Sequence, residues 1–241
     1  MSDASTSECM SPELLKVVER AKTEPEGRFH SLAHLLDVAA LMRAYKRMRK
    51  DAAVGVDAVT KEHYGRALEE NLRGLHQRLV SKQYRHQPIR RVHIPKDGGK
   101  TRPIGISAFE DKLVQDAVRE VLEAIYEQDF LDCSFGFRPG RRAHDAIRVL
   151  DRIAHRGHVS WILEADIVSF FDSLDRTKLK ELLQIRVADG SLMRLIGKSG
   201  PPHLNSENPS ENLERVVGPP AGNLASLRDA PRSVCGCPLQ E

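Results

Sequence analysis

The feature that most constrains the fold is a single hairpin signal within a chain whose other periodic segments are helical. Residues 88–107, PIRRVHIPKDGGKTRPIGIS, place β-branched runs on both sides of the segment Lys96–Lys100, KDGGK. Asp-Gly-Gly between such runs is typical of a tight turn joining two antiparallel strands. We therefore expect a β-hairpin in the middle of the chain.

Amphipathic helices are predicted on both sides of this hairpin, because apolar residues recur there at helical spacing. The predicted helices span 12–22, 31–50, about 60–81, about 110–127, 143–155 and 175–187. Pro12 suits a first helical turn, and Asp175 is expected to be an N-cap. Residues 159–168, VSWILEADIV, are predicted to form a further strand. Helices combined with a few strands indicate an α+β fold.

The two ends of the chain have a different composition. Residues 199–241 contain seven of the 13 prolines and no Phe, Tyr or Trp. Such a segment has few core-forming residues, so we expect 199–241 and residues 1–10 to be disordered. The N-terminus does not have the pattern of a signal peptide, and no apolar run reaches the roughly 18 residues of a membrane span. A cytoplasmic protein that does not enter the membrane is expected.

Composition alone excludes few other classes of protein or binding site. The net charge of +3 is small, so a case for nucleic-acid binding depends on where the charges lie. The four cysteines are Cys9, Cys133, Cys235 and Cys237. They form no C-x-x-C pair and have no matching histidine spacing, so a zinc site is not expected.

Basic residues are concentrated in two places. Six lie between residues 85 and 102, where Asp97 is the only acid: Arg85, Arg90, Arg91, Lys96, Lys100 and Arg102. A hairpin would present them as a positive ribbon suited to phosphates, although a solvated hairpin with lysines that block edge pairing fits as well. The second place is the turn SFGFRPGRR, with Arg138, Arg141 and Arg142 before a helix N-terminus, where anions bind. A turn with a basic surface is the alternative.

The stretch ADIVSFFDSLD, residues 165–175, places Asp166 at the end of the predicted strand. An acid at that point is a candidate metal ligand for phosphoryl transfer, and Phe170 and Phe171 are candidates for a nucleotide pocket or for the core. By spacing alone, the structural interpretation is favoured: an acid before a turn, phenylalanines in the core, and Asp172 and Asp175 at a helix start.

The order of these blocks resembles the N-terminal half of group II intron-encoded reverse transcriptases, the intron maturases. The matching segments are AAVGVDAVT, YRHQPIRRVHIPKDGGKTRPIGIS, EDKLVQDAVREVLEAIYEQDF, SFGFRPGRRAHDAI and LEADIVSFFDSLD, and the resemblance covers about residues 30–198. It implies a right-hand polymerase. An N-terminal helical extension would span 1–49, the fingers 50–158 and the start of an incomplete palm 159–198, with 199–241 as a non-family tail.

The resemblance also implies roles for individual residues. Asp166 corresponds to the first metal-binding aspartate, and the Ile167 backbone carbonyl is a second candidate donor to Mg²⁺. Incoming deoxynucleotides would contact Lys96, Lys100, Arg102 and Phe171. Template RNA or intron RNA would contact Arg85, Arg90, Arg91, Arg138, Arg141 and Arg142. For Arg138 and the basic residues near it, the alternative is that they hold the fingers together. A DNA primer would be the further partner.

The chain also departs from this family. It contains no Asp-Asp pair, and the glutamine-glycine block and the rest of the palm are not recognisable after LMRLIGK. One carboxylate cannot hold two Mg²⁺ ions. We therefore expect a truncated, catalytically incomplete RNA-directed DNA polymerase from a mobile element, or else a non-catalytic RNA-binding remnant. A nucleotidyl cyclase is a weaker alternative, since the basic turn would then have no explanation.

Overall fold

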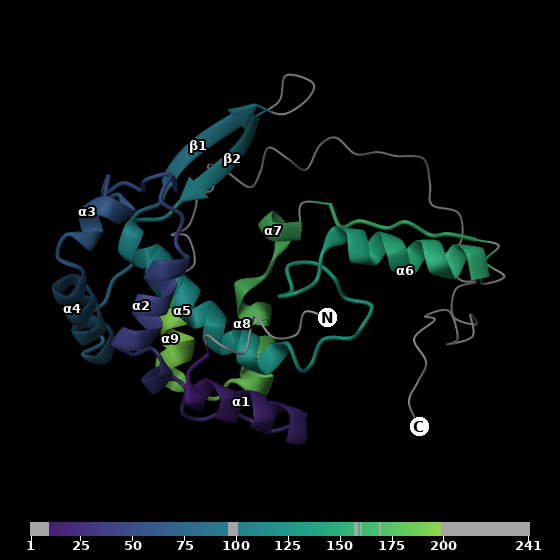
Figure 1. Cartoon of the computed structure of the whole chain (residues 1–241), viewed down its shortest axis with the longest axis horizontal. Helices are drawn as coiled ribbons and strands as arrows, with labels where there is room; N and C mark the ends of the chain where they lie inside the picture. The colour runs from purple at the N-terminus through teal and green to yellow at the C-terminus, as the bar shows by residue number, and fades with distance from the viewer. Residues whose placement is uncertain (1–9, 96–100, 157–158, 160, 169, 199–241) are drawn as a thin grey trace.

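The computed structural model describes residues 10–95, 101–156, 159, 161–168 and 170–198. The elements, in chain order, are α1 (Pro12–Thr23), η2 (Ala33–Leu35), α2 (Val38–Arg47), α3 (Lys61–Gly65), α4 (Leu68–Val80), β1 (Arg90–Pro95), β2 (Thr101–Ile106), α5 (Phe109–Tyr126), α6 (Ala143–Arg156), α7 (Phe170–Ser173), α8 (Arg176–Arg186) and α9 (Gly190–Lys198). Most of the helices cluster at one end, and a two-stranded sheet extends from this cluster (Figure 1). The α+β class predicted from the sequence is confirmed.

Helix α5 forms the centre of the helical part. Its buried face runs along most of its length, and each of five side chains is at most 1% exposed: Leu113, Val114, Ala117, Val121 and Ile125. Helices α1 and α2 pack against α5, and α4 packs against α2 (Figure 1). Complete burial of a Val, Leu or Ile side chain contributes about 1.5–3 kcal/mol. The buried cluster extends from Leu14 to Met193, so the first and last described helices share one hydrophobic core.

The N-terminus of α5 is capped by a residue from a distant segment. Ala108, its N-cap residue, has no side chain that could accept a hydrogen bond. Instead Asp57 Oδ2 accepts from the backbone N of Phe109 at 2.8 Å. Gly55 allows this approach, because a Cβ added there would lie 2.6 Å from Ala108 Cα. The segment around GVD therefore fixes where α5 begins, and with it the base of the hairpin.

The hairpin forms where the sequence predicts it. Strands β1 and β2 are antiparallel, with Arg90 opposite Ile106 and Pro95 opposite Thr101. They project away from the helices (Figure 1), and even the apolar Ile94 and Ile104 are 46% and 38% exposed. An isolated two-stranded hairpin is at best marginally stable in water. Its position therefore depends on contacts at its base.

Several helix boundaries differ from the predicted ones. The helix predicted at 31–50 begins at Val38, because the Asp37 carboxylate accepts from the backbone N of Ala40 at 2.7 Å and caps it there. The helix predicted at about 60–81 is divided into α3 and α4 after Gly65, and Asn71 Nδ2 donates to the carbonyl of Tyr64 across the break. Helix α9 was not predicted. The predicted Asp175 N-cap of α8 is confirmed.

The prediction of a strand at 159–168 is wrong for the residues described there. Residues 159 and 161–168 belong to no helix or strand. Trp161, Leu163 and Val168 are 92%, 93% and 87% exposed. A strand needs a hydrogen-bonded neighbour, and the hairpin is the only sheet in the described part of the chain. The segment therefore contains strand-forming residues but has no neighbouring strand among the described residues to pair with.

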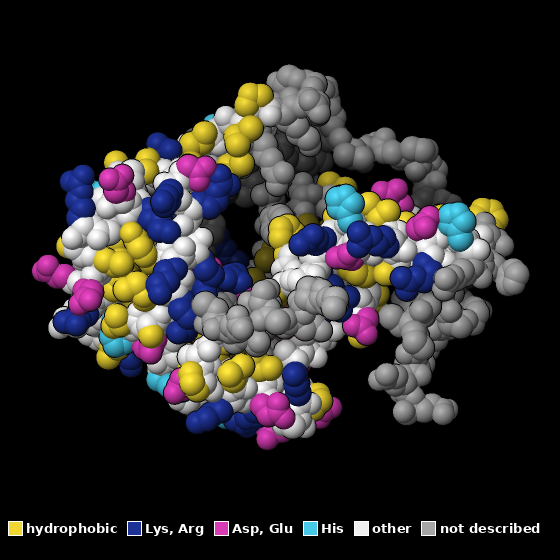
Figure 2. Space-filling view, in the orientation of Figure 1, with side chains coloured by type: hydrophobic (Ala, Val, Ile, Leu, Met, Phe, Trp, Pro, Cys, Tyr) yellow, Lys and Arg dark blue, Asp and Glu magenta, His cyan; other side chains and the backbone are white. Residues whose placement is uncertain are grey.

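Two amphipathic helices leave apolar residues in solvent. On α6, Ile147, Leu150 and Ile153 are 62%, 55% and 45% exposed, and on α8, Leu182 and Ile185 are similarly exposed. Figure 2 shows hydrophobic side chains at the surface, among the Lys, Arg and His of the α6 region. No helix within the described ranges is long and apolar enough to cross a bilayer.

Candidate nucleic-acid interface

The base of the hairpin is held by a buried carboxylate. Asp111, on the first turns of α5, is 1% exposed, and its Oδ2 accepts from the backbone N of Gln87 at 3.0 Å. Its Oδ1 accepts from the Tyr84 hydroxyl. Burial, followed by this hydrogen bond to Asp111, raises the pKa of Tyr84, so Tyr84 remains a neutral donor. These contacts fix the chain three residues before β1.

The hairpin and the segment before it present cations that have no ion-pair partner among the described residues. Arg85, Arg90 and Arg91 are all exposed, and no described residue forms an ion pair with any of them. Lys112, on α5, adds positive charge nearby. Burial lowers the pKa of Lys112, Asp57 raises it, and the charge of Arg90 lowers it further. Because Arg85, Arg90 and Arg91 have no ion-pair partner among the described residues, phosphates can bind them without displacing a described carboxylate.

Of the four predicted nucleotide contacts, two lie outside the described residues and two are described only in part. Lys96 and Lys100 lie outside the described residues. Arg102 belongs to β2, where its backbone is opposite Ile94. Phe171 belongs to the short helix α7. For Arg102 and Phe171, the structure therefore gives the position in an element but not the side-chain environment.

The arginines of the GFRPGRR turn have different environments. Arg138 is 8% exposed. Its guanidinium donates to Glu127 and to the carbonyls of Leu131 and Ser134, at 2.7–3.2 Å, and lies 5.2 Å from the ring centroid of Phe130. A cation satisfied in this way stabilises the turn.

Arg141 and Arg142 follow in the same turn. Arg141 donates to the carboxylate and the carbonyl of Asp132 and stacks over Phe135, 5.3 Å from the ring centroid. Arg142 is exposed, and its backbone N donates to Asp145 at the start of α6. No described carboxylate pairs with the Arg142 side chain. Of the three arginines, Arg142 is therefore the one available to an external anion.

Asp166 lies in the exposed segment after α6. Its Oδ1 accepts from the backbone N of Ile167 at 2.9 Å, and Ile167 is 64% exposed. Within the described ranges, no group of three or more His, Cys, Asp or Glu side chains lies close enough to hold a metal ion. A two-ion Mg²⁺ site needs several carboxylates close together, and the described residues around Asp166 form no such group.

Sequence reasoning missed the residues that bind distant segments together. Arg186, 4% exposed, donates to Asp129 and to the carbonyls of Glu24 and Gly27. Glu120, 7% exposed, accepts from Arg43 and Arg47. The partners are separated by at least 57 positions, so no local spacing reveals them. Charged residues on otherwise apolar helix faces were the one available signal.

A basic hairpin anchored on a helical core is an arrangement suited to a nucleic-acid-binding protein. A family model described as reverse transcriptase (RNA-dependent DNA polymerase) matches residues 94–211. Protein YkfC of Escherichia coli K12 is 35% identical over 193 residues, covering 76% of this chain and 50% of YkfC. The group II intron-encoded protein LtrA of Lactococcus lactis is 36% identical over 156 residues, covering 64% of this chain and 26% of LtrA.

A third relative is an uncharacterized 91 kDa protein in the cob intron of Schizosaccharomyces pombe, 40% identical over 152 residues. It is covered over 18% of its length, and this chain over 62%. The chain belongs to the group II intron-encoded reverse transcriptase/maturase family, of which it carries a part. It spans about half the length of YkfC and about a quarter of LtrA.

Proposed function

We propose that this chain is the RNA-binding fingers portion of a group II intron-type reverse transcriptase, with its hairpin arginines as the principal contacts to template or intron RNA. Residues 50–158 would be the fingers, 159–198 the start of the palm, 1–49 a helical extension and 199–241 a tail. The observation that carries the proposal is the set of exposed cations Arg85, Arg90 and Arg91, which have no ion-pair partner among the described residues.

The geometry of the hairpin supports this role. Alternate residues of a strand point to opposite faces, so Arg90 and Arg91 reach opposite sides of the ribbon. A nucleic-acid backbone passing along either side could therefore meet a guanidinium. The buried contacts of Asp111 hold the base of the ribbon on α5. The binding free energy then comes from phosphates and released counterions, so affinity depends strongly on salt.

Polymerisation by this chain alone is not part of the proposal. When bound, Mg²⁺ would activate a primer hydroxyl and stabilise the leaving phosphate. Asp166 and the Ile167 carbonyl are the donors that the family resemblance assigns to the ion. The sequence contains no Asp-Asp pair that could supply further carboxylates. We therefore expect RNA binding without primer extension, and contacts to a DNA primer or deoxynucleotides only where further palm residues are supplied.

Two assays test the proposal. Filter binding of a single-stranded RNA should give salt-dependent retention that weakens in the Arg90→Ala/Arg91→Ala variant and persists in Lys16→Ala, which removes an exposed cation on α1. Primer extension on an RNA template with Mg²⁺ should give no product. Extension that Asp166→Ala abolishes would contradict the catalytic half of the proposal, and RNA binding insensitive to the hairpin arginines would contradict the binding half.

A further inference from the structure

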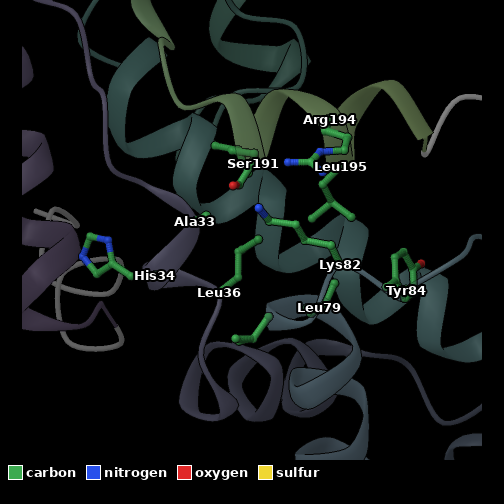
Figure 3. A pocket seen from close by; sticks show the side chains of 11 residues that line it. Ala33, His34, Leu36, Leu79, Lys82, Tyr84, Ser191, Arg194 and Leu195 are labelled. Carbon is green, nitrogen blue, oxygen red and sulfur yellow. The ribbon is translucent and has the colours of Figure 1, made fainter.

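A pocket of about 300 Å³ lies between three segments that are far apart in the sequence. It is bounded by the turn around η2, by the end of α4 with the residues after it, and by the start of α9 (Figure 3). None of its lining residues belongs to the hairpin or to the GFRPGRR turn. The pocket shares Tyr84 with the base of the hairpin, but none of its lining residues is one of the interface cations.

The floor of the pocket is apolar. Leu36 and Leu192 are 5% and 0% exposed and belong to the hydrophobic core, and Leu79 and Leu195 lie beside them. Tyr84 also lines the pocket, with its hydroxyl donating to Asp111. A flat, weakly polar ring can bury its surface on such a floor, gaining about 25 cal/mol for each Å² removed from water.

Two cations lie at the rim. Lys82, which follows α4, and Arg194, on α9, extend toward Ser191 in Figure 3. No described acid forms an ion pair with either of them, and no Asp or Glu is among the lining residues. Cations from segments 112 positions apart thus line the same apolar floor, and none of the described carboxylates lines it with them. A bound anion would be stabilised by both.

The nearest acid in the sequence, Asp189, does not neutralise these cations. Its carboxylate accepts four backbone N–H groups, from Leu32, Ala33, Ser191 and Leu192, at 2.6–3.1 Å. Burial acts to raise the pKa of Asp189, but these four hydrogen bonds outweigh it and lower the pKa. The Asp189 carboxylate therefore joins the η2 turn to the start of α9 through these hydrogen bonds.

The backbone conformation of Lys82 also helps to place its side chain at the pocket. Lys82 has φ of +62°, in the left-handed region that favours glycine or asparagine. A non-glycine residue there costs roughly 1–2 kcal/mol. A lysine held in that conformation brings its ammonium group to the pocket rim (Figure 3). This conformation is a common ending of a helix, here at the residue after the C-cap of α4, and it sets the direction in which Lys82 leaves that helix.

We propose that this pocket binds one nucleotide of a single-stranded RNA, with Lys82 and Arg194 on the phosphate and the base on the floor formed by Leu36, Leu79 and Leu195. Its volume lies at the lower end of the range for small-ligand pockets, about 300–1,000 Å³. The inference rests on the proposed RNA-binding function and adds a second, separate contact to it.

The test combines a mononucleotide with an RNA strand. In amide NMR spectra of the full chain, AMP should shift residues 33–36, 82–84 and 191–195, and inorganic phosphate should shift them less because it leaves the apolar floor empty. Lys82→Asn and Arg194→Gln should each weaken AMP binding severalfold. The double variant should bind a labelled 12-nucleotide RNA with a salt slope smaller by about 1. Lys16→Gln should leave both unchanged.

The outcomes separate this inference from the proposed function. Lys82→Asn suits the left-handed backbone, so its thermal midpoint should be no lower than that of the parent chain, and lost binding cannot be attributed to unfolding. If neither AMP nor RNA shifts the pocket residues while the hairpin variant still loses RNA, the pocket inference is wrong and the proposed function stands. If AMP binds in the pocket but RNA binds nowhere, the proposed function is wrong.

Discussion

Asp189 is 7% exposed, and replacing it with alanine should destabilise the fold more than replacing an exposed helix cap. Two of its four donors belong to Leu32 and Leu192, which are fully buried. A buried donor left unsatisfied costs about 1–3 kcal/mol, and loss of a helix cap about 1 kcal/mol. The two buried donors alone give about 2–6 kcal/mol, so Asp189→Ala should lower the free energy of unfolding by at least about 2 kcal/mol.

Urea denaturation followed by circular dichroism measures this loss. Asp175→Ala is the matched control, because its carboxylate caps α8 through the backbone N of Thr177 and Lys178 at an exposed site. That variant should lose only about 1 kcal/mol. Equal losses in the two variants, or a loss under about 1 kcal/mol for Asp189→Ala, would refute the inference that this carboxylate joins the η2 turn to α9.

The same carboxylate should make stability depend on pH. The folded-state pKa of Asp189 lies below its ordinary value. Its contribution is therefore fully present above the unfolded pKa, near 4, and is lost as the pH falls through the lower folded pKa. The free energy of unfolding should decrease more steeply below about pH 4 in the parent chain than in Asp189→Asn. An equal decrease in the free energy of unfolding below about pH 4 in the two proteins would contradict this assignment.

Three further predictions concern other parts of the chain. Arg138→Ala should lower the thermal midpoint by several degrees because it leaves Glu127 without its buried partner. Arg142→Ala should leave the midpoint unchanged and reduce RNA affinity. The reverse pattern would contradict the roles assigned to the two arginines. Replacing Trp161 and Leu163 with serine should reduce concentration-dependent light scattering without lowering the midpoint, because both side chains are more than 90% exposed. Gly55→Ala should destabilise the fold measurably in urea melts, since its Cβ would meet the backbone of Ala108; an unchanged midpoint would refute the close approach.

The elements that local sequence determines were predicted well. The hairpin follows from turn residues between β-branched runs, and α5 and α6 follow from apolar spacing, because each signal lies within a few residues of the element it specifies. The divided helix at Gly65 and the late start of α2 depend on Asn71 and Asp37 side chains that bond to the backbone, which apolar spacing does not record.

Tertiary contacts explain what sequence reasoning could not reach. The strand predicted at 159–168 has the required residues but lacks a neighbouring strand in the described part of the chain, so its described side chains stay in solvent. Arg138 carries the same charge as Arg142 and lies four positions away, yet burial against Glu127 gives it a different environment. The pocket at Lys82 and Arg194 joins segments 112 positions apart, beyond any motif.

The salt dependence of RNA binding tests the central claim most directly. Each phosphate contact to a single strand contributes about 0.7 to the slope of log K against log salt concentration. Replacing Arg90 and Arg91 with alanine should therefore reduce the slope by about 1.4, while Lys16→Ala changes it little. An unchanged slope and affinity in the doubly substituted chain would contradict the claim that the hairpin is the RNA-binding surface.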